Sequence, residues 1–182
     1  MMKVTIEDEF NKTDLTLTDG TFSIQYVDGM TTKTVGKITS GQYGKWRIET
    51  EQYFPIMLGL VNSTSTALAP LNHIHPNTII VLVDYEWEPK KDQKTWVAAI
   101  KKTSEDLHAI WKYEYVLKLR NYFLKSMTDA QKAILIYHEL LHIRKDGKVS
   151  PHHDVDDFSP IVTKFGVDWM DNPEVMNPLD LS

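Results

Sequence analysis

Apolar and polar residues alternate over the first part of the chain and then give way to longer apolar runs. Alternation on both sides of Asp19-Gly20 predicts a β-hairpin, with apolar positions at Leu15, Leu17, Phe22, Ile24 and Tyr26. Residues 45–48 predict another strand, whereas residues 55–61 are too uniformly apolar to separate a helix from a strand. Small and polar residues from 62 to 70 predict a loop, so we expect residues 1–62 to form a β-rich N-terminal subdomain.

The remaining residues, 71–182, are predicted to contain both strands and helices. The apolar run at 78–85 has the length of a strand that is covered on both faces. Asp92 is a candidate cap for a helix reaching about residue 112, because apolar residues recur at helical spacing at Trp96, Ile100, Leu107 and Trp111. Residues 113–119 alternate and predict a half-exposed strand. With a β-rich first part and both strands and helices in the rest, we expect an α+β fold.

A further helix is predicted to begin at Asp129. Thr128 and Gln131 have the spacing of a capping box, in which each side chain satisfies the other residue's backbone amide. Arg144 and Lys145 suit the last turn, and Gly147 suits a left-handed residue that ends the helix after about 17 residues. This helix is apolar on nearly all sides between residues 133 and 143, so we expect it to be buried.

Three ionisable residues interrupt this apolar helix, in the run His138-Glu139-Leu140-Leu141-His142. His138 and His142 are four residues apart and share one face, where both rings can bind one ion at about 2.0–2.1 Å. Zinc is the ion that fits this pair best, because neutral imidazole is a suitable ligand for it. Glu139 projects about 100° around the helix from His138, where it can reach a metal-activated water as general base. The pattern predicts zinc-dependent hydrolysis of peptide bonds.

The alternative interpretation is a pair of hydrogen-bonded core histidines beside a solvated glutamate. It does not explain why two imidazoles and a carboxylate occupy an otherwise apolar helix, where each unpaired polar group costs about 1–3 kcal/mol. We therefore favour the metal site.

A third ligand has to come from outside the helix, and a polar segment follows the loop at Gly147. His153 is the first choice and His152 the second, and Asp154, Asp156 or Asp157 are alternatives if the loop folds differently. Asp154 fits better as a hydrogen-bond acceptor for a ligand imidazole, or as the cap of the next helix.

The other histidines carry weaker signals. His73 and His75 would share a face in a strand and suggest a second metal site, but two ligands beside a proline are weak support. His108 has no partner at ligand spacing, so we expect a structural or exposed role.

Composition narrows the function classes. With 20 Lys and Arg against 25 Asp and Glu, the net charge is −5. The molecule as a whole therefore does not attract nucleic acid, whose binding would need a local basic patch. A local cluster of Lys90, Lys91, Lys94, Lys101 and Lys102 is interspersed with acidic residues, as on a solvated helix face. The chain has no cysteine, which excludes disulfides and thiolate ligands. No signal peptide or membrane-spanning run is visible, so we expect a cytoplasmic protein.

The sequence from Ala133 to Ile143, followed by 153–158 and by 165–169, resembles the putative phage metallopeptidase family. The resemblance covers roughly the last third of the chain, including the strand at 113–120 and the helix entry at 127–131. It implies a zincin-like metallopeptidase core in residues 71–182, encoded by a phage or prophage, with an HExxH motif and Zn²⁺. It also implies that His138, His142 and His153 bind the metal and that Glu139 is the catalytic base.

A zincin layout also implies an edge strand that accepts an extended peptide or protein substrate. We assign this role to the strand at 113–119, with Tyr113 or Tyr115 as a candidate for oxyanion stabilisation. One rival function is a zincin-like binding protein or inhibitor that acts on a host protein and keeps a structural metal. Another is a DNA-associated protease that uses the lysine cluster at 90–102.

Overall fold

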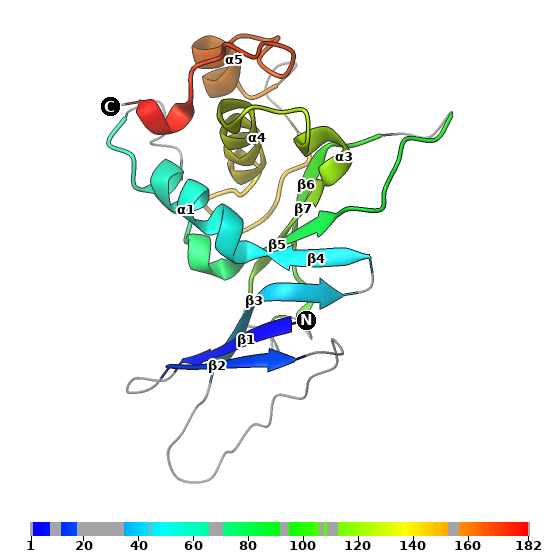
Figure 1. Ribbon diagram of the computed structural model, residues 1–182. Coiled ribbons are helices and arrows are strands. Elements are labelled where there is room, and N and C mark those ends of the chain that lie inside the picture. Colours follow the sequence, from blue (N-terminus) through cyan, green and yellow to red (C-terminus); the bar gives the residue numbers. More distant parts are fainter. Residues whose placement is uncertain are drawn as a thin grey trace.

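One sheet of seven strands organises the described part of the molecule (Figure 1). The computed structural model describes residues 2–7, 12–17, 35–43, 45–65, 71–91, 95–105, 108, 113–152 and 157–181. The strand order is β2-β1-β3-β4-β5-β7-β6. Only the pair β5 and β7 is parallel among these neighbours. The strands are β1 Met2–Glu7, β2 Lys12–Leu17, β3 Val35–Tyr43, β4 Trp46–Glu49, β5 Ile79–Asp84, β6 Ala98–Lys102 and β7 Tyr115–Arg120.

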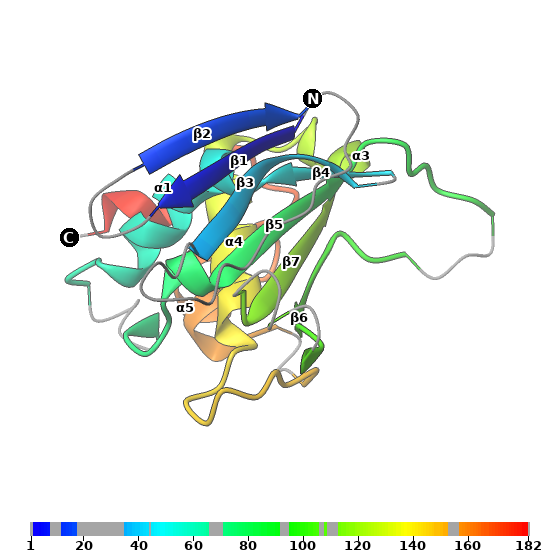
Figure 2. The ribbon, with the colours of Figure 1, turned by 90° about the horizontal axis from the view of Figure 1, so that it is seen from below.

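Helices pack on one face of this sheet. They are α1 Thr50–Val61, α3 Asn121–Leu124, α4 Asp129–Leu141 and α5 Ser159–Phe165, with short 3₁₀ helices η2 Pro76–Thr78 and η3 Pro178–Asp180. Figures 1 and 2 show α1, α4 and α5 on the same side of the strands. The core lies between these layers, where Ile134 and Leu140 of α4 join Val81 of β5 and Leu117 of β7 in one apolar cluster. The α+β class is confirmed.

The central strand β5 confirms the prediction from the apolar run at 78–85. Every residue from Ile79 to Asp84 is buried, and β5 is paired on both sides, with β4 and with β7. A strand in this position has no face on which polar side chains would meet solvent, so its sequence is continuously apolar up to Asp84.

The prediction of one helix from Asp92 to about residue 112 is wrong. Ala98–Lys102 form the strand β6, in which Ile100 is buried and Lys101 and Lys102 are exposed. Helical conformation occurs further on, at Glu105 and His108. Pairing with β7 decides the structure of this segment, because a tertiary partner outweighs the weak helical preference of a short sequence.

The prediction that residues 113–119 form an edge strand is also wrong. Residues 115–120 do form a strand, but β7 lies between β5 and β6. The strand on the outer side of β7 is β6, which comes from the segment predicted as a helix. The edge of the sheet next to α4 is therefore β6.

The N-terminal predictions are tested only in part. Residues 18–34, with the predicted Asp19-Gly20 turn, lie outside the described residues; β2 pairs with β1 in the register Met2↔Leu17. The strand expected at 45–48 is β4, and residues 55–61 belong to α1. Because β4 pairs with β5, strands from 1–62 and from 71–182 share one sheet, and the division into two parts stays a prediction. Among the described residues, no helix has the length and apolar character needed to cross a membrane.

Candidate metal centre

The start of α4 confirms the predicted capping box. The Gln131 backbone N–H donates to Thr128 Oγ1 at 3.2 Å, and the Thr128 N–H donates to Gln131 Oε1 at 2.8 Å. The Gln131 Nε2 also donates to the Met170 carbonyl at 2.7 Å, so the same side chain attaches the helix to the C-terminal segment. This fixes the rotation and position of α4, and with them the direction of its functional side chains.

The end of α4 differs from the prediction, since the helix stops at Leu141 and is 13 residues long. Beyond it the chain reverses: Ile143 pairs with Val149, and the Gly147 N–H donates to the Arg144 carbonyl at 2.9 Å. Gly147 has φ +75°, so the left-handed residue belongs to this reversal rather than to the helix end. The reversal brings Ser150 beside His142.

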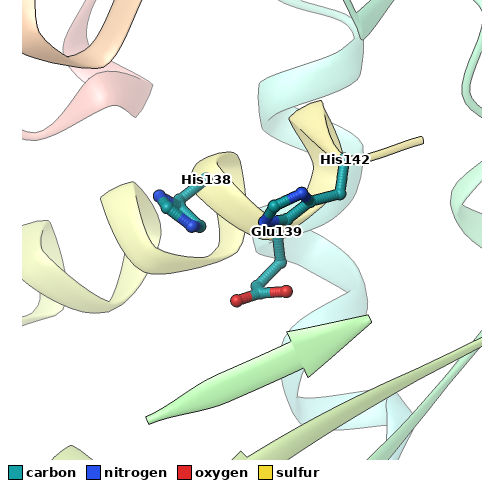
Figure 3. A group of neighbouring side chains, drawn as sticks. All are labelled: His138, Glu139 and His142. Atoms are coloured by element: carbon teal, nitrogen blue, oxygen red, sulfur yellow. The ribbon is translucent and has the colours of Figure 1, made fainter. Parts of the chain in front are cut away.

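His138, Glu139 and His142 form a compact group at the C-terminal end of α4 (Figure 3). One potential ligand atom from each of the three lies within 4.8 Å of the others, and the imidazole centroids are 5.1 Å apart. In the described part of the chain this is the one group of three such residues that could hold a metal ion. Figure 3 shows the Glu139 carboxylate pointing from the helix toward the sheet.

Hydrogen bonds fix the orientation of both imidazole rings. His142 Nδ1 lies 2.6 Å from the Ser150 carbonyl oxygen, and His138 Nδ1 lies 2.7 Å from Asp157 Oδ1. A carbonyl oxygen only accepts, so Nδ1 of His142 carries the proton, and the ionised carboxylate makes the same assignment for His138. The nitrogen that each ring can offer to a cation is therefore Nε2, which is the usual arrangement behind a metal-ligating histidine.

Asp157 is held in place from two further sides. Its carboxylate accepts the Phe158 backbone N–H at 2.6 Å and the Trp169 indole N–H at 3.0 Å. Burial alone would raise the pKa of Asp157, but hydrogen bonds from His138, Trp169 and Phe158 outweigh it and lower the pKa to about 2. The carboxyl is therefore ionised at neutral pH. Sequence reasoning considered Asp157 only as an alternative ligand, and gave the role of hydrogen-bond acceptor to Asp154.

The partners of the two rings were not all visible in the sequence. Ser150 acts through its backbone carbonyl, for which no side-chain signal exists. Trp169 was noted as part of a family resemblance, without a role, although a buried indole needs a hydrogen-bond acceptor.

Glu139 is almost fully buried, with 4% of its surface exposed. Burial raises its pKa to about 7, although the His138 ring and a hydrogen bond from the Ile100 backbone N–H lower it, and Asp157 adds to the rise. The carboxyl can therefore take up and release a proton near neutral pH, which is what general acid–base chemistry requires.

The remaining predicted site residues fall into two groups. His153, Asp154 and Asp156 lie outside the described residues, so the third ligand stays a prediction; His152 is exposed. Tyr113 and Tyr115 are buried, and the Tyr115 hydroxyl donates to the Gly147 carbonyl at 3.1 Å. These tyrosines therefore support the core and the chain reversal next to the site.

The weaker histidine signals do not build a second site in the described residues. His73 Nε2 donates to the Ile143 carbonyl at 2.9 Å, just beyond His142, whereas His75 is exposed. His108 Nδ1 donates to the Tyr113 carbonyl at 3.2 Å, in line with a structural role.

Comparison with protein families matches residues 28–177 to the family described as putative phage metallopeptidase. No curated protein and no solved structure matches the chain. The match is longer than the last third of the chain that the sequence suggested, and from residue 28 onward it includes β3, β4 and α1. Because the match covers most of the chain and contains the His-Glu-His group, this protein belongs to the putative phage metallopeptidase family.

Proposed function

We propose that this protein is a zinc-dependent metallopeptidase, encoded by a phage or prophage, that cleaves peptide bonds in a peptide or protein substrate. The observation that carries the proposal is the pair of imidazoles whose Nδ1 atoms are both engaged, at 2.7 and 2.6 Å, beside a buried carboxyl group. Membership of a metallopeptidase family supports it. The core that holds the group is then zincin-like.

The donor set fits zinc better than other common cations. Two neutral imidazoles suit Zn²⁺, whereas Mg²⁺ and Ca²⁺ prefer sites built from oxygen ligands. His138 and His142 would bind the ion together with His153, which leaves a fourth position open, as in catalytic rather than structural zinc sites. When bound, zinc polarises a carbonyl group and makes water a stronger nucleophile at neutral pH.

Glu139 supplies the proton transfers in this proposal. Its carboxylate accepts a proton from the attacking water and passes it to the nitrogen of the leaving amine. Burial raises the pKa of this carboxyl group, which makes it a better proton acceptor than an exposed glutamate. Asp157 and Ser150 hold the two rings in place meanwhile, and Trp169 holds Asp157.

β6 is the strand that we assign to substrate binding. Val97 accepts a backbone hydrogen bond from Arg120, and Thr103 donates one to Glu114, in register with the ladder to β7. Because antiparallel ladders alternate, the backbone N–H and C=O groups of Ala98, Ile100 and Lys102 point away from β7, toward the open edge. The Ile100 N–H donates to the Glu139 carboxylate, so a peptide would pair with the other groups of this edge. An extended peptide can pair with such an edge by strand addition.

Replacement of the base tests the enzyme proposal. Purified Glu139→Gln protein is expected to keep wild-type zinc stoichiometry and to lose cleavage of a defined peptide pool, followed by mass spectrometry. Glu114→Gln is the control, since Glu114 is half-buried just before β7 but is not part of the His138, Glu139 and His142 group. Wild-type cleavage by Glu139→Gln would overturn the proposal. A wild-type protein that holds zinc but cleaves no peptide would favour the rival function of a binding protein with a structural metal.

A further inference from the structure

Arg120, the last residue of β7, is buried between two tryptophans. Its guanidinium carbon lies 3.9 Å from the ring centroid of Trp87 and 3.8 Å from that of Trp96, and only 6% of the residue is exposed. Planar guanidinium groups stack on aromatic faces in this way, whereas an ammonium group does not.

Arg120 also makes two directional contacts to the residues just before β6. Its Nη1 donates to the Trp96 carbonyl at 3.0 Å, and its backbone N–H donates to the Val97 carbonyl at 3.1 Å. The stacked Trp96 ring adds a third attachment to the same dipeptide. One residue thus fixes the point where the chain enters β6, through its side chain and its backbone N–H.

A short chain of contacts leads from there to the candidate metal centre. Ile100 lies three residues beyond Val97, in the middle of β6, and its backbone N–H donates to the Glu139 carboxylate. β6 is an edge strand, and among the described strands it pairs with β7 alone. A small displacement of the start of β6 would therefore move the Ile100 amide relative to Glu139.

The burial of this charge calls for a reason beyond packing. Among the described residues, the charge of Asp84 acts on Arg120, and Asp84 itself forms an ion pair with Lys45 at 2.8 Å. A buried charge that shares its counter-ion costs stability. Apolar residues of similar volume in its place often leave a protein equally stable or more stable. An apolar side chain, however, could not hold the Trp96 carbonyl.

We propose that Arg120 is a positioning residue that sets the place of β6, and thereby of the Ile100 amide and of the edge that receives substrate. The inference rests on the proposed function for its catalytic consequence, but the structural coupling stands independently of it.

Two tryptophan variants provide a matched test, because both rings stack on Arg120 at nearly equal distances. Trp96→Leu removes the ring two positions before β6. Trp87→Leu removes the ring eleven positions before β6, which also packs against Tyr122 and Phe123. If general stability decided the outcome, Trp87→Leu would be the more damaging change.

Amide hydrogen exchange is the first measurement, and it needs no substrate. Arg120→Lys and Trp96→Leu are expected to speed exchange of the hydrogen-bonded amides of Ala99, Ile100 and Lys101 by about tenfold or more, with the amides of α4 unchanged, since an edge strand opens locally. Trp87→Leu is expected to leave these three amides near the wild-type exchange rate. Equal effects of the two tryptophan variants, or none in Arg120→Lys, would overturn the proposal, and Trp96→Phe should restore protection.

Kinetics on the same peptide pool provides the second measurement. Arg120→Lys is expected to keep zinc stoichiometry while kcat/KM falls by about tenfold to a hundredfold, the usual cost of a misplacement near 1 Å. Trp87→Leu should stay within about threefold of the wild type by the same measure. If the wild type cleaves nothing, the proposed function fails, whereas the exchange comparison still decides whether Arg120 positions β6.

Discussion

At the scale of single residues, the two candidate ligands, His138 and His142, differ in the hydrogen-bond partner of their Nδ1 atoms. His138 is oriented by the charged side chain of Asp157, and His142 by the backbone carbonyl of Ser150. A substitution can remove the first partner but not the second. The contribution of ring orientation to metal binding can therefore be measured through Asp157.

Asp157→Asn is expected to weaken zinc binding by about 10–100-fold while the fold is kept. The amide oxygen can still accept from His138 and from the Phe158 N–H, but the negative charge is lost. The amide NH₂ group would also face the Trp169 indole N–H, so two donors would meet. Competition with a chelator of known affinity measures the change.

Asp129→Asn serves as the control for this prediction, because Asp129 lies at the opposite end of α4 and its side chain is 94% exposed. It should leave zinc affinity within the error of the measurement. Unchanged affinity in Asp157→Asn would show that ring orientation does not depend on this carboxylate.

At the scale of elements, Gln131 joins two functions in one side chain. Its oxygen caps α4 through Thr128, and its Nε2 faces the carbonyls of Trp169, Met170 and Asn172. Glutamate is normally as good as glutamine at this position of a capping box. At this buried position, however, the second carboxylate oxygen of a glutamate would replace Nε2 and face carbonyl oxygens, which are also acceptors.

Gln131→Glu is therefore expected to destabilise the protein by about 1–3 kcal/mol, the cost of leaving buried hydrogen-bonding groups unpaired. Urea unfolding followed by circular dichroism measures the free energy of unfolding. Thr128→Ser keeps the capping oxygen and should change this free energy by much less. A Gln131→Glu protein as stable as the wild type would mean that the capping role alone fixes this residue.

Elements with a strong local signal could be predicted, and those decided by distant partners could not. The start of α4 follows from Thr128 and Gln131 themselves, and β5 follows from its unbroken apolar run. β6 becomes a strand because β7 pairs with it and Arg120 holds its entry, and both partners come later in the sequence. The early end of α4 likewise depends on the pairing of Ile143 with Val149.

In the candidate site, too, the residues of one helix could be predicted and their distant partners could not. The spacing of His138, Glu139 and His142 is a property of one helix, so the sequence was enough to bring them together. The choice of Asp157 as the carboxylate behind His138 depends on Trp169 and on the return of the chain after the helix. Nothing local distinguishes Asp157 from the neighbouring aspartates.

At the scale of the whole molecule, the group of His138, Glu139 and His142 lies where the helical layer meets the β6 edge of the sheet. α4 packs on the core face, and the Glu139 carboxylate reaches across to the backbone of β6 (Figures 1 and 3). The two histidines and Glu139 are thus partly enclosed by apolar residues and still lie next to the β6 edge of the sheet. Folding and cation binding should be linked in such a place, since the unfolded chain has no preformed site.

Zinc is therefore expected to raise the melting temperature of the metal-free protein. At a free concentration of about 100 times Kd, binding to the folded state alone adds about 2.7 kcal/mol. For a chain of this size that corresponds to roughly 5–10 °C in Tm. Calorimetry of protein treated with a chelator, before and after addition of zinc, measures the shift.

Histidine variants show whether this shift comes from the proposed ligands. His142→Ala should remove most of it, because one of the two oriented rings is lost, and His153→Ala should do the same if His153 is the third ligand. His152→Ala should keep it, since that exposed side chain is adjacent in sequence but outside the proposed ligand set. A full shift in His142→Ala would place the stabilising cation elsewhere on the protein, and the metal centre would then lose its thermodynamic support. A full shift in His153→Ala but not in His152→Ala would instead move the third ligand to His152, without changing the role of the helix.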